Sequence, residues 1–276
     1  MKILTKRVRD AIGSLVRGTE HDAPLPFPSV DLFYWRPVDG RINFGDHLSA
    51  VIVSSLLAKH QLTLEDEVSV QRRLLGIGSI LHFCRPGDVV WGSGINGKID
   101  PKSYSLPTNI DVRAVRGPLT AEVLRKRGIQ VPDVFGDPGL LIKHLFGQRF
   151  MPSAQTDVLF VPNLHDIPKV PNGIHWVSPT LGWNRVVAEI VKAKLVLASS
   201  LHGLVIAESF GIPARYVRLS ETEDLFKYRD YYAGSGRGQL EFATGYMEGL
   251  EMGGAPAPRW EAGPLLQSFP LDLWRQ

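Results

Sequence analysis

The sequence predicts an α/β protein built from two parallel-sheet units. Short apolar strands repeatedly run into glycine-containing turns and then into helices, which is typical of strand–helix–strand units in a parallel sheet. The pattern pauses in a loop rich in Pro, Gly and Gln and restarts at residue 157. The chain has 276 residues, of which 44% are hydrophobic, and this is enough for two modest cores.

In the first unit, the pattern predicts strands at residues 31–35, 72–76, 88–91 and 111–115. Helices are expected at residues 47–60 and about 118–127. Pro118 suits the first turn of a helix, because its missing N–H would be unpaired there. Gly128 suits the helix end, because glycine tolerates a positive φ.

In the second unit, strands are expected at residues 157–161, 195–199 and 214–219, and helices at 183–193, 203–210 and 221–232. The boundary near residues 148–156 predicts an N-terminal lobe of residues 1–150 and a C-terminal lobe of residues 151–276. The tail from residue 253 contains several prolines and should be mostly irregular. Its aromatic residues Trp260, Phe269 and Trp274 imply that it docks on the rest of the protein.

The N-terminus carries the whole charge excess of the chain. Residues 1–20 hold five basic and two acidic side chains, and the net charge of the protein is +3. Apolar residues near helical spacing predict a basic amphipathic helix within residues 1–20, followed by a linker at residues 21–30. This helix either packs on its own domain or makes peripheral contact with the inner membrane through residues 1–18. The remaining chain is neutral, which argues against nucleic acid as a partner.

Composition excludes several other classes. Cys84 is the only cysteine, so neither an intrachain disulfide nor a cysteine-based zinc site can form. No apolar run reaches the roughly 18 residues of a membrane span, and no secretory signal is evident, so a cytoplasmic protein is expected. The chain lacks a Walker loop, a His-Glu-x-x-His sequence and a Gly-x-Ser-x-Gly elbow. Metal hydrolysis, nucleotide hydrolysis and serine esterase chemistry are therefore disfavoured.

Three glycine-containing motifs follow predicted strands. Asn43-Phe44-Gly45-Asp46 stands where a strand leads into a helix, and the free N–H groups of a helix start favour an anion or a polar ligand. The alternative is that Asp46 only caps the helix. Gly76-Ile77-Gly78-Ser79 and Trp91-Gly92-Ser93-Gly94 repeat the arrangement without completing a dinucleotide fingerprint. We expect them to lie side by side as the floor of a cleft.

Arg116 and Asp137 are further candidates in the first unit. Arg116 follows a strand and precedes a helix start, where a guanidinium can grip a carboxylate or phosphate in a bidentate manner. An Arg solvated on the surface is the alternative. Asp137, in Gly136-Asp137-Pro138-Gly139, is a candidate base, a partner for Arg, or only a turn former.

The sharpest signal is Ser199-Ser200-Leu201-His202-Gly203. It lies between an apolar strand and a helix, so His202 stands at a strand-to-helix switch among small residues and backbone donors. A histidine placed there can donate a proton, accept one, or bind anionic oxygen when protonated. His165 also follows a strand, and from there it could reach the cleft.

These motifs, in their order and spacing, resemble the polysaccharide pyruvyltransferases. The resemblance spans about residues 31–235 and is greatest to the short, ketal-forming exopolysaccharide type. The segments that carry it are 43–46, 113–120, 135–138, 199–207 with 211–213, and 227–232.

The resemblance implies two Rossmann-like lobes that face each other across a cleft, as in GT-B glycosyltransferases. It also implies phosphoenolpyruvate as donor, no separate cofactor, and a sugar of an exopolysaccharide or lipid-linked oligosaccharide as acceptor. Arg116 would bind the acidic groups of the donor, and His202 would be the catalytic histidine. Many relatives have Arg at the position of Ser200, and Arg237, Arg218 and Lys227 are candidates to replace that charge.

Ketal formation needs a proton for the methylene carbon of the donor, a base for the sugar hydroxyls, and cations for carboxylate and phosphate. We expect His202 as the acid and Asp46 or Asp137 as the base. No metal ligand is expected, and the expected substrate-binding residues are Arg116, Asn43, Gly45, Gly92, Ser93, Gly94, Ser199, Ser200, Leu201, Gly203 and Lys227. Two alternatives remain: a GT-B glycosyltransferase that uses a nucleotide sugar, and a non-catalytic sugar-binding protein.

Overall fold

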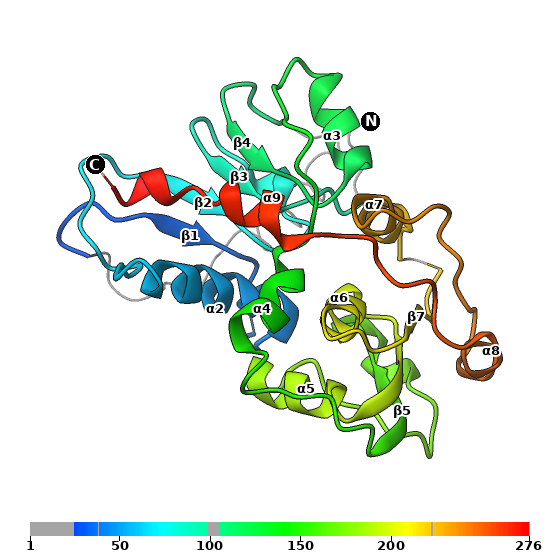
Figure 1. Cartoon of the computed structure of the whole chain (residues 1–276). Coiled ribbons are helices and arrows are strands. Elements are labelled where there is room, and N and C mark those ends of the chain that lie inside the picture. The colour runs from blue at the N-terminus through cyan, green and yellow to red at the C-terminus, as the bar shows by residue number, and fades with distance from the viewer. Residues whose placement is uncertain (1–24, 38, 99–104, 222, 276) are drawn as a thin grey trace.

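Two parallel β-sheets form the centre of the computed structural model, which describes residues 25–37, 39–98, 105–221 and 223–275 (Figure 1). The first has the order β1 (Asp31–Phe33), β2 (Arg73–Leu75), β3 (Val89–Trp91), β4 (Asp111–Ala114). The second has the order β5 (Thr156–Val161), β6 (Ala193–Ala198), β7 (Ala214–Tyr216). Every pairing between these strands is parallel, which confirms the predicted α/β class with two parallel sheets.

The helices follow the strands in the predicted order. Those of eight residues or more are α2 (Phe44–Ala58), α3 (Pro118–Arg125), α5 (Trp183–Ile190), α6 (Leu201–Ser209) and α7 (Phe226–Gly234). Shorter ones are α4 (Ile142–Phe146), α8 (Tyr246–Met252) and α9 (Ala262–Gln267). Four 3₁₀ segments, η1 (Leu81–Phe83), η3 (Pro138–Leu141), η4 (Leu164–Lys169) and η5 (Leu271–Leu273), complete the described elements. The helix expected within residues 1–20 lies outside the described residues.

Two helices begin earlier than the sequence pattern indicates. The expected start of α2 was residue 47, but Phe44 is already helical, because the Asn43 side chain accepts a hydrogen bond from the Gly45 N–H and caps the helix. Asp46 is therefore a first-turn residue and not the cap. In the same way, Ser200 caps α6 by accepting from the Gly203 N–H, so His202 lies inside the first turn.

One hydrophobic core includes residues of both sheets. Trp91 of β3 and Leu159 of β5 belong to the same buried cluster, and Leu48 of α2, Leu140 of η3 and Val205 of α6 belong to it as well. The element η3 packs against both α2 and α6. Since these helices begin at the carboxyl ends of strands, their packing fixes the loops at those ends relative to each other.

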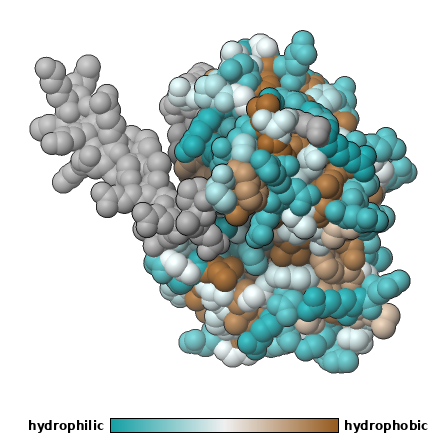
Figure 2. Space-filling view, turned by 90° about the vertical axis from the view of Figure 1, so that its left-hand side faces the viewer, coloured by the Kyte–Doolittle hydropathy of each residue, from teal (hydrophilic) through white to brown (hydrophobic). Residues whose placement is uncertain are grey.

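The face of the molecule shown in Figure 2 is mostly hydrophilic, with hydrophobic residues in scattered groups. The large apolar residues with the greatest exposure come from segments far apart in the sequence, such as Ile42, Val70, Met151 and Met247. None of the helices in the described ranges has the length and apolar character needed to cross a membrane.

Helix α7 docks on α3 through a buried ion pair. Asp230 of α7 is fully buried, and its Oδ2 lies 3.0 Å from Nη2 of Arg116. The same carboxylate accepts hydrogen bonds from the backbone N–H and the hydroxyl of Thr120, at 2.9 and 2.7 Å. Gly117 is required at this contact, because an added Cβ would lie 1.9 Å from the Asp230 carbonyl oxygen.

The C-terminal tail returns to the first sheet, as the red segment in Figure 1 shows. The indole N–H of Trp91 donates to the Leu265 carbonyl at 3.1 Å, and the Trp91 ring packs edge-on against Phe269. Arg113 of β4 makes a bidentate contact with Asp272, with distances of 2.8 and 2.9 Å. The tail therefore docks as its aromatic residues predict, and it contains α9 and η5.

The ion pair of Asp230 should contribute far more to stability than that of Asp272. Replacing Asp230 by Asn leaves the buried Arg116 without a counter-charge, so we expect a loss of about 3 kcal/mol or more in the free energy of unfolding. The matched control, Asp272→Asn, removes a carboxylate whose side chain is 57% exposed and should cost less than about 1 kcal/mol. Urea denaturation of both variants checks this, and equal losses would show that the buried pair has no special role.

Candidate active site

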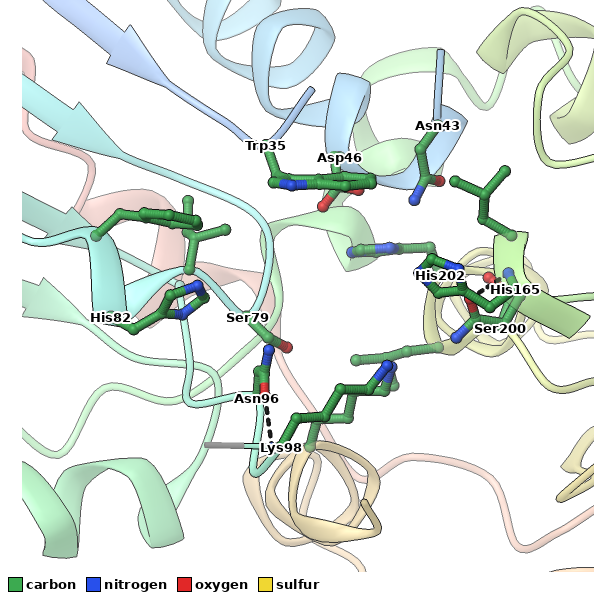
Figure 3. Close-up of a pocket in the computed structure, with 16 residues that line it drawn as sticks. Trp35, Asn43, Asp46, Ser79, His82, Asn96, Lys98, His165, Ser200 and His202 are labelled. Carbon is green, nitrogen blue, oxygen red and sulfur yellow. Dashed lines mark hydrogen bonds between the residues drawn. The ribbon is translucent and has the colours of Figure 1, made fainter. Parts of the chain in front are cut away.

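A pocket of about 400 Å³ lies at the carboxyl ends of strands from both sheets (Figure 3). Trp35 follows β1, Ser79 follows β2, Asn96 and Lys98 follow β3, and His165 follows β5. The starts of α2 and α6 contribute Asn43, Asp46, Ser200, Leu201 and His202, and α7 contributes Lys227. Ligands of open parallel sheets bind at such edges, where helix N-termini also present free N–H groups.

His202 lies between α2 and η3, and the chain around it leaves little free space. Gly45 packs on the imidazole so closely that an added Cβ would lie 2.1 Å from Nδ1. On its other side, Nε2 is 3.8 Å from Oδ2 of Asp137. Both of these atoms are buried and have no hydrogen-bond partner among the described residues. Asp137 is itself fixed, because its Oδ1 accepts from the Gly139 N–H.

The two carboxyl groups expected at the site both have a raised pKa. Burial raises the pKa of Asp46 to about 7, with a further increase from Asp137 and an opposing decrease from the charge of Lys227. Burial also raises the pKa of Asp137 to about 6, against the Gly139 hydrogen bond and the charge of Arg116. Within the described part of the chain, Asp46 is the only carboxylic acid on the pocket wall. It can therefore exchange a proton with a ligand near neutral pH.

The imidazole of His202 is neutral at physiological pH. Burial lowers its pKa to about 3, and the nearby positive charges of Lys227 and Arg116 lower it further. A neutral imidazole can accept a proton from a hydroxyl group. A bound anion would favour the protonated form, because it would offset the two positive charges.

Two lysines supply positive charge to the pocket and share one carboxylate. Glu223 forms ion pairs with Lys227 and with Lys98, the latter at 2.7 Å. Burial lowers the pKa of Lys227, whereas the charge of Glu223 opposes this effect. Two lysines and one glutamate leave one net positive charge, so the lower side of the pocket in Figure 3 can attract an anion.

Arg116 lies beneath the pocket and not on its wall. Its side chain is 1% exposed, and its guanidinium donates to Asp230, to the Ser79 hydroxyl and to the Ile95 carbonyl. Through Ser79, which lines the pocket, it fixes the loop after β2. A direct grip of Arg116 on a donor stays a prediction, since this guanidinium is already engaged by protein groups.

The other glycine and serine residues expected at the site support the wall from behind. Ser93 donates to the Gly78 carbonyl at 2.9 Å, which places the loops after β2 and β3 side by side as expected. Gly94 packs against the Arg116 guanidinium and Gly92 against Pro138. Ser199 accepts a hydrogen bond from the Asn163 N–H, and Gly203 packs on Val161.

Many relatives have an arginine at the position of Ser200, and three cations of this chain were considered as its replacement. Of these, Lys227 lies in the pocket. Arg237 pairs instead with Glu208, and both side chains are 4% exposed. Arg218 donates to the carbonyl groups of Glu221 and Glu223 outside the pocket wall. The structure therefore brings together Asn43, Asp46, Ser200, Leu201, His202 and Lys227 of the residues expected from the sequence.

Sequence reasoning missed several wall residues, notably Trp35, Lys98 and Asn96, and it missed Glu223 beside them. Trp35 was taken as the last residue of a strand, yet β1 ends at Phe33 and the indole lies beyond it. Lys98 lies seven positions beyond the end of β3, in a loop without a recognisable motif. The only indication in the sequence was position, since Trp35 and Lys98 each follow a strand of the first sheet.

Comparisons with known proteins identify two relatives, one of which is named for succinoglycan biosynthesis. The succinoglycan biosynthesis protein ExoV of Rhizobium meliloti is 27% identical over 213 residues, which cover 72% of this chain and 63% of that protein. The match thus spans less than two thirds of the length of this relative. An uncharacterized protein of Acanthamoeba polyphaga mimivirus is 23% identical over 204 residues, which cover 69% of this chain and 70% of that protein.

A crystal structure of a functionally uncharacterized protein from Klebsiella pneumoniae aligns with a TM-score of 0.49 and 11% identity, and the alignment covers 89% of this chain and all of that one. The family described as polysaccharide pyruvyl transferase matches residues 43–221, a span that contains Asn43, Asp46, Arg116, Asp137 and His202. Because this match covers more than half of the sequence, the chain belongs to the polysaccharide pyruvyl transferase family.

Proposed function

We propose that the protein transfers pyruvate from phosphoenolpyruvate to two hydroxyl groups of a sugar, in an exopolysaccharide or a lipid-linked oligosaccharide, and forms a pyruvyl ketal. Besides membership of the family, one observation supports this proposal. A single pocket combines a carboxyl group with a pKa near 7, a neutral imidazole and two lysines. These are the acid, base and cationic groups that ketal formation from an anionic enol ester requires.

The proposal takes the two sheets as the centres of two Rossmann-like lobes, residues 1–150 and 151–276, that face each other across the pocket as in GT-B enzymes. Support comes from the pocket wall, to which the carboxyl ends of both sheets contribute. Trp91 and Asp272 show that the last residues of the chain cross back to the first sheet. In this proposal the tail ties the C-terminal lobe to the N-terminal lobe.

The donor carries a carboxylate and a phosphate, so it should occupy the side of the pocket near Lys227 and Lys98. The first turn of α6 adds backbone N–H groups and the positive end of a helix dipole beside Ser200 and Leu201. A bound donor would compete with Glu223 for the two lysines. The position of Lys227 makes it our candidate for the charge that relatives supply with arginine at Ser200.

The reaction begins with a proton transfer to the methylene carbon of the donor, which makes the adjacent carbon electrophilic. We assign this proton to Asp46, and the assignment differs from the acid role expected for His202 from sequence. Asp46 is on the wall, has no hydrogen-bond partner within the described ranges, and holds a proton near neutral pH. His202 holds none there.

His202 then serves as the base for the attacking hydroxyl. Its Nε2 faces Asp137, and we take Nδ1, which lies beside Gly45, as the nitrogen that accepts the hydroxyl proton. The carboxylate of Asp137 stabilises the imidazolium that forms and fixes the ring. The first hydroxyl bonds to the electrophilic carbon, phosphate leaves with its bonding electrons, and the second hydroxyl closes the ketal. One of the two hydroxyl protons replaces that taken up by the methylene carbon, and the other leaves with the phosphate.

The reaction class is tested by incubating a pool of lipid-linked oligosaccharides with the protein and phosphoenolpyruvate. We expect phosphate release together with a mass gain of one pyruvyl ketal per oligosaccharide, and a loss of about 100-fold or more in His202→Ala. Release of a nucleoside diphosphate from a nucleotide sugar would replace this function with glycosyl transfer. Tight sugar binding without turnover of either donor would indicate a non-catalytic protein.

The pH dependence should identify Asp46 as the acid. Since the carboxyl must be protonated, kcat/KM for phosphoenolpyruvate should fall as the pH rises through about 7. Asp46→Asn should lower kcat by about 100-fold or more and remove this falling limb, because an amide cannot ionise in this range. If the variant keeps the limb, another group titrates and the assignment is wrong.

Lys227 should act on both donor binding and this titration. In Lys227→Met, we expect KM for phosphoenolpyruvate to rise by about tenfold, because one charge contact with the donor is lost. The falling limb should also move to higher pH, since the lysine charge lowers the pKa of Asp46. Lys126→Met removes an exposed lysine of the α3 C-terminus and serves as control. A changed KM without a shift of the falling limb would show that Lys227 binds the donor but does not affect the pKa of the acid.

A further inference from the structure

A second hollow, of about 240 Å³, adjoins the active-site pocket. It is lined by described residues of the segment between β1 and α2 and by His47 of α2. Trp35 and Asn43 line both spaces, so the two adjoin at these side chains. In Figure 3, Trp35, Asp46 and Asn43 lie together on the side of the pocket away from Lys98. The hollow therefore adjoins the pocket on the side of the proposed acid.

Neighbouring side chains engage both arginines of this hollow. Arg41 pairs with Asp39 at 2.7 Å, and the guanidinium of Arg36 lies over the Tyr34 ring and donates to the Tyr34 hydroxyl. Burial and the charge of Arg36 lower the pKa of His47, so this ring is neutral at physiological pH. The two lysines proposed to bind the donor, Lys98 and Lys227, line the active-site pocket and not this hollow.

The remaining surface suits a sugar. The indole of Trp35 is half-buried and, within the described ranges, packs against no other ring, so one of its faces can receive the apolar face of a pyranose. Asn43 uses its carboxamide oxygen to cap α2, which leaves its NH₂ group to donate to a hydroxyl. The Nδ1 atom of His47 is buried without a hydrogen-bond partner among the described residues.

We propose that this hollow is the acceptor subsite, in which a pyranose stacks on Trp35 while Asn43 orients its hydroxyl pair toward the donor. This proposal rests on the proposed function, because only pyruvyl transfer makes the bound sugar the acceptor. Ile42 lies on the rim of the hollow and is 49% exposed, so the neighbouring sugars of an oligosaccharide can leave the site across it.

Two substitutions test the subsite. Trp35→Ala removes the stacking surface, and Ile42→Trp fills the hollow without touching the active-site pocket. The matched control is Val70→Trp, at an apolar residue that is 55% exposed and precedes β2 at the opposite end of the first sheet. The probe is the pool of oligosaccharides released by mild acid from its lipid carriers.

We expect both hollow variants to raise the acceptor KM by about tenfold. Ile42→Trp, which changes a residue of the hollow alone, should leave donor KM unchanged within about twofold. Both hollow variants should weaken equilibrium binding of the same pool, measured without phosphoenolpyruvate, by a similar factor, whereas Val70→Trp leaves both constants unchanged. An unchanged acceptor KM in Ile42→Trp, or a parallel rise in donor KM, would overturn the subsite.

The two proposals fail in different ways. If wild-type protein binds the oligosaccharide pool and the hollow variants do not, while no phosphate is released from phosphoenolpyruvate, the subsite stands and the proposed function falls. If wild-type protein forms ketals and the hollow variants match it, the function stands and the subsite falls. Wild-type protein that binds no oligosaccharide overturns the subsite.

Discussion

The buried carboxylate of Asp230 connects parts of the chain that are far apart in sequence. It joins α7 to the start of α3 and at the same time holds Arg116, which in turn binds Ser79 on the pocket wall. Lys227 lies three positions before Asp230, on the neighbouring turn of the same helix. The ion pair therefore positions a lysine from the C-terminal half and a serine from the N-terminal half around one pocket.

Burial has opposite consequences for the groups around this pocket. It raises the pKa of Asp46 and lowers that of His202, because each loses hydration of its charged form. Lys227 adds to the effect on His202 and opposes the one on Asp46. A carboxyl group that keeps its proton thus lies close to an imidazole that has none. An acid and a base can coexist there because neither carries a charge before the substrate arrives.

The strands could be predicted from sequence, because each is a short apolar run that ends in glycine or a polar motif. Helix starts were less accurate, since Asn43 and Ser200 act as caps and draw the following residues into the first turn. His202 and Asp46 were found because they belong to motifs at strand ends, and Lys227 because it belongs to segment 227–232, which carries the family resemblance. The engagement of Arg116 was not foreseeable, as its partner Asp230 is 114 positions away. Trp35 and Lys98 were not predicted as site residues for a related reason, because only the tertiary structure brings their loops together on the pocket wall.

The return of the tail to the first sheet has a consequence for how the chain folds during synthesis. Trp91 is among the largest fully buried side chains, yet the groups that cover it, Leu265 and Phe269, are more than 170 positions later. A nascent chain that has emerged only as far as β4 leaves this indole and its N–H uncovered on the ribosome. The first sheet consequently cannot complete its packing before the tail has been made, and until then the N-terminal half leaves an apolar surface uncovered. Contacts of such sequence separation also slow folding, since a long loop must close before they form.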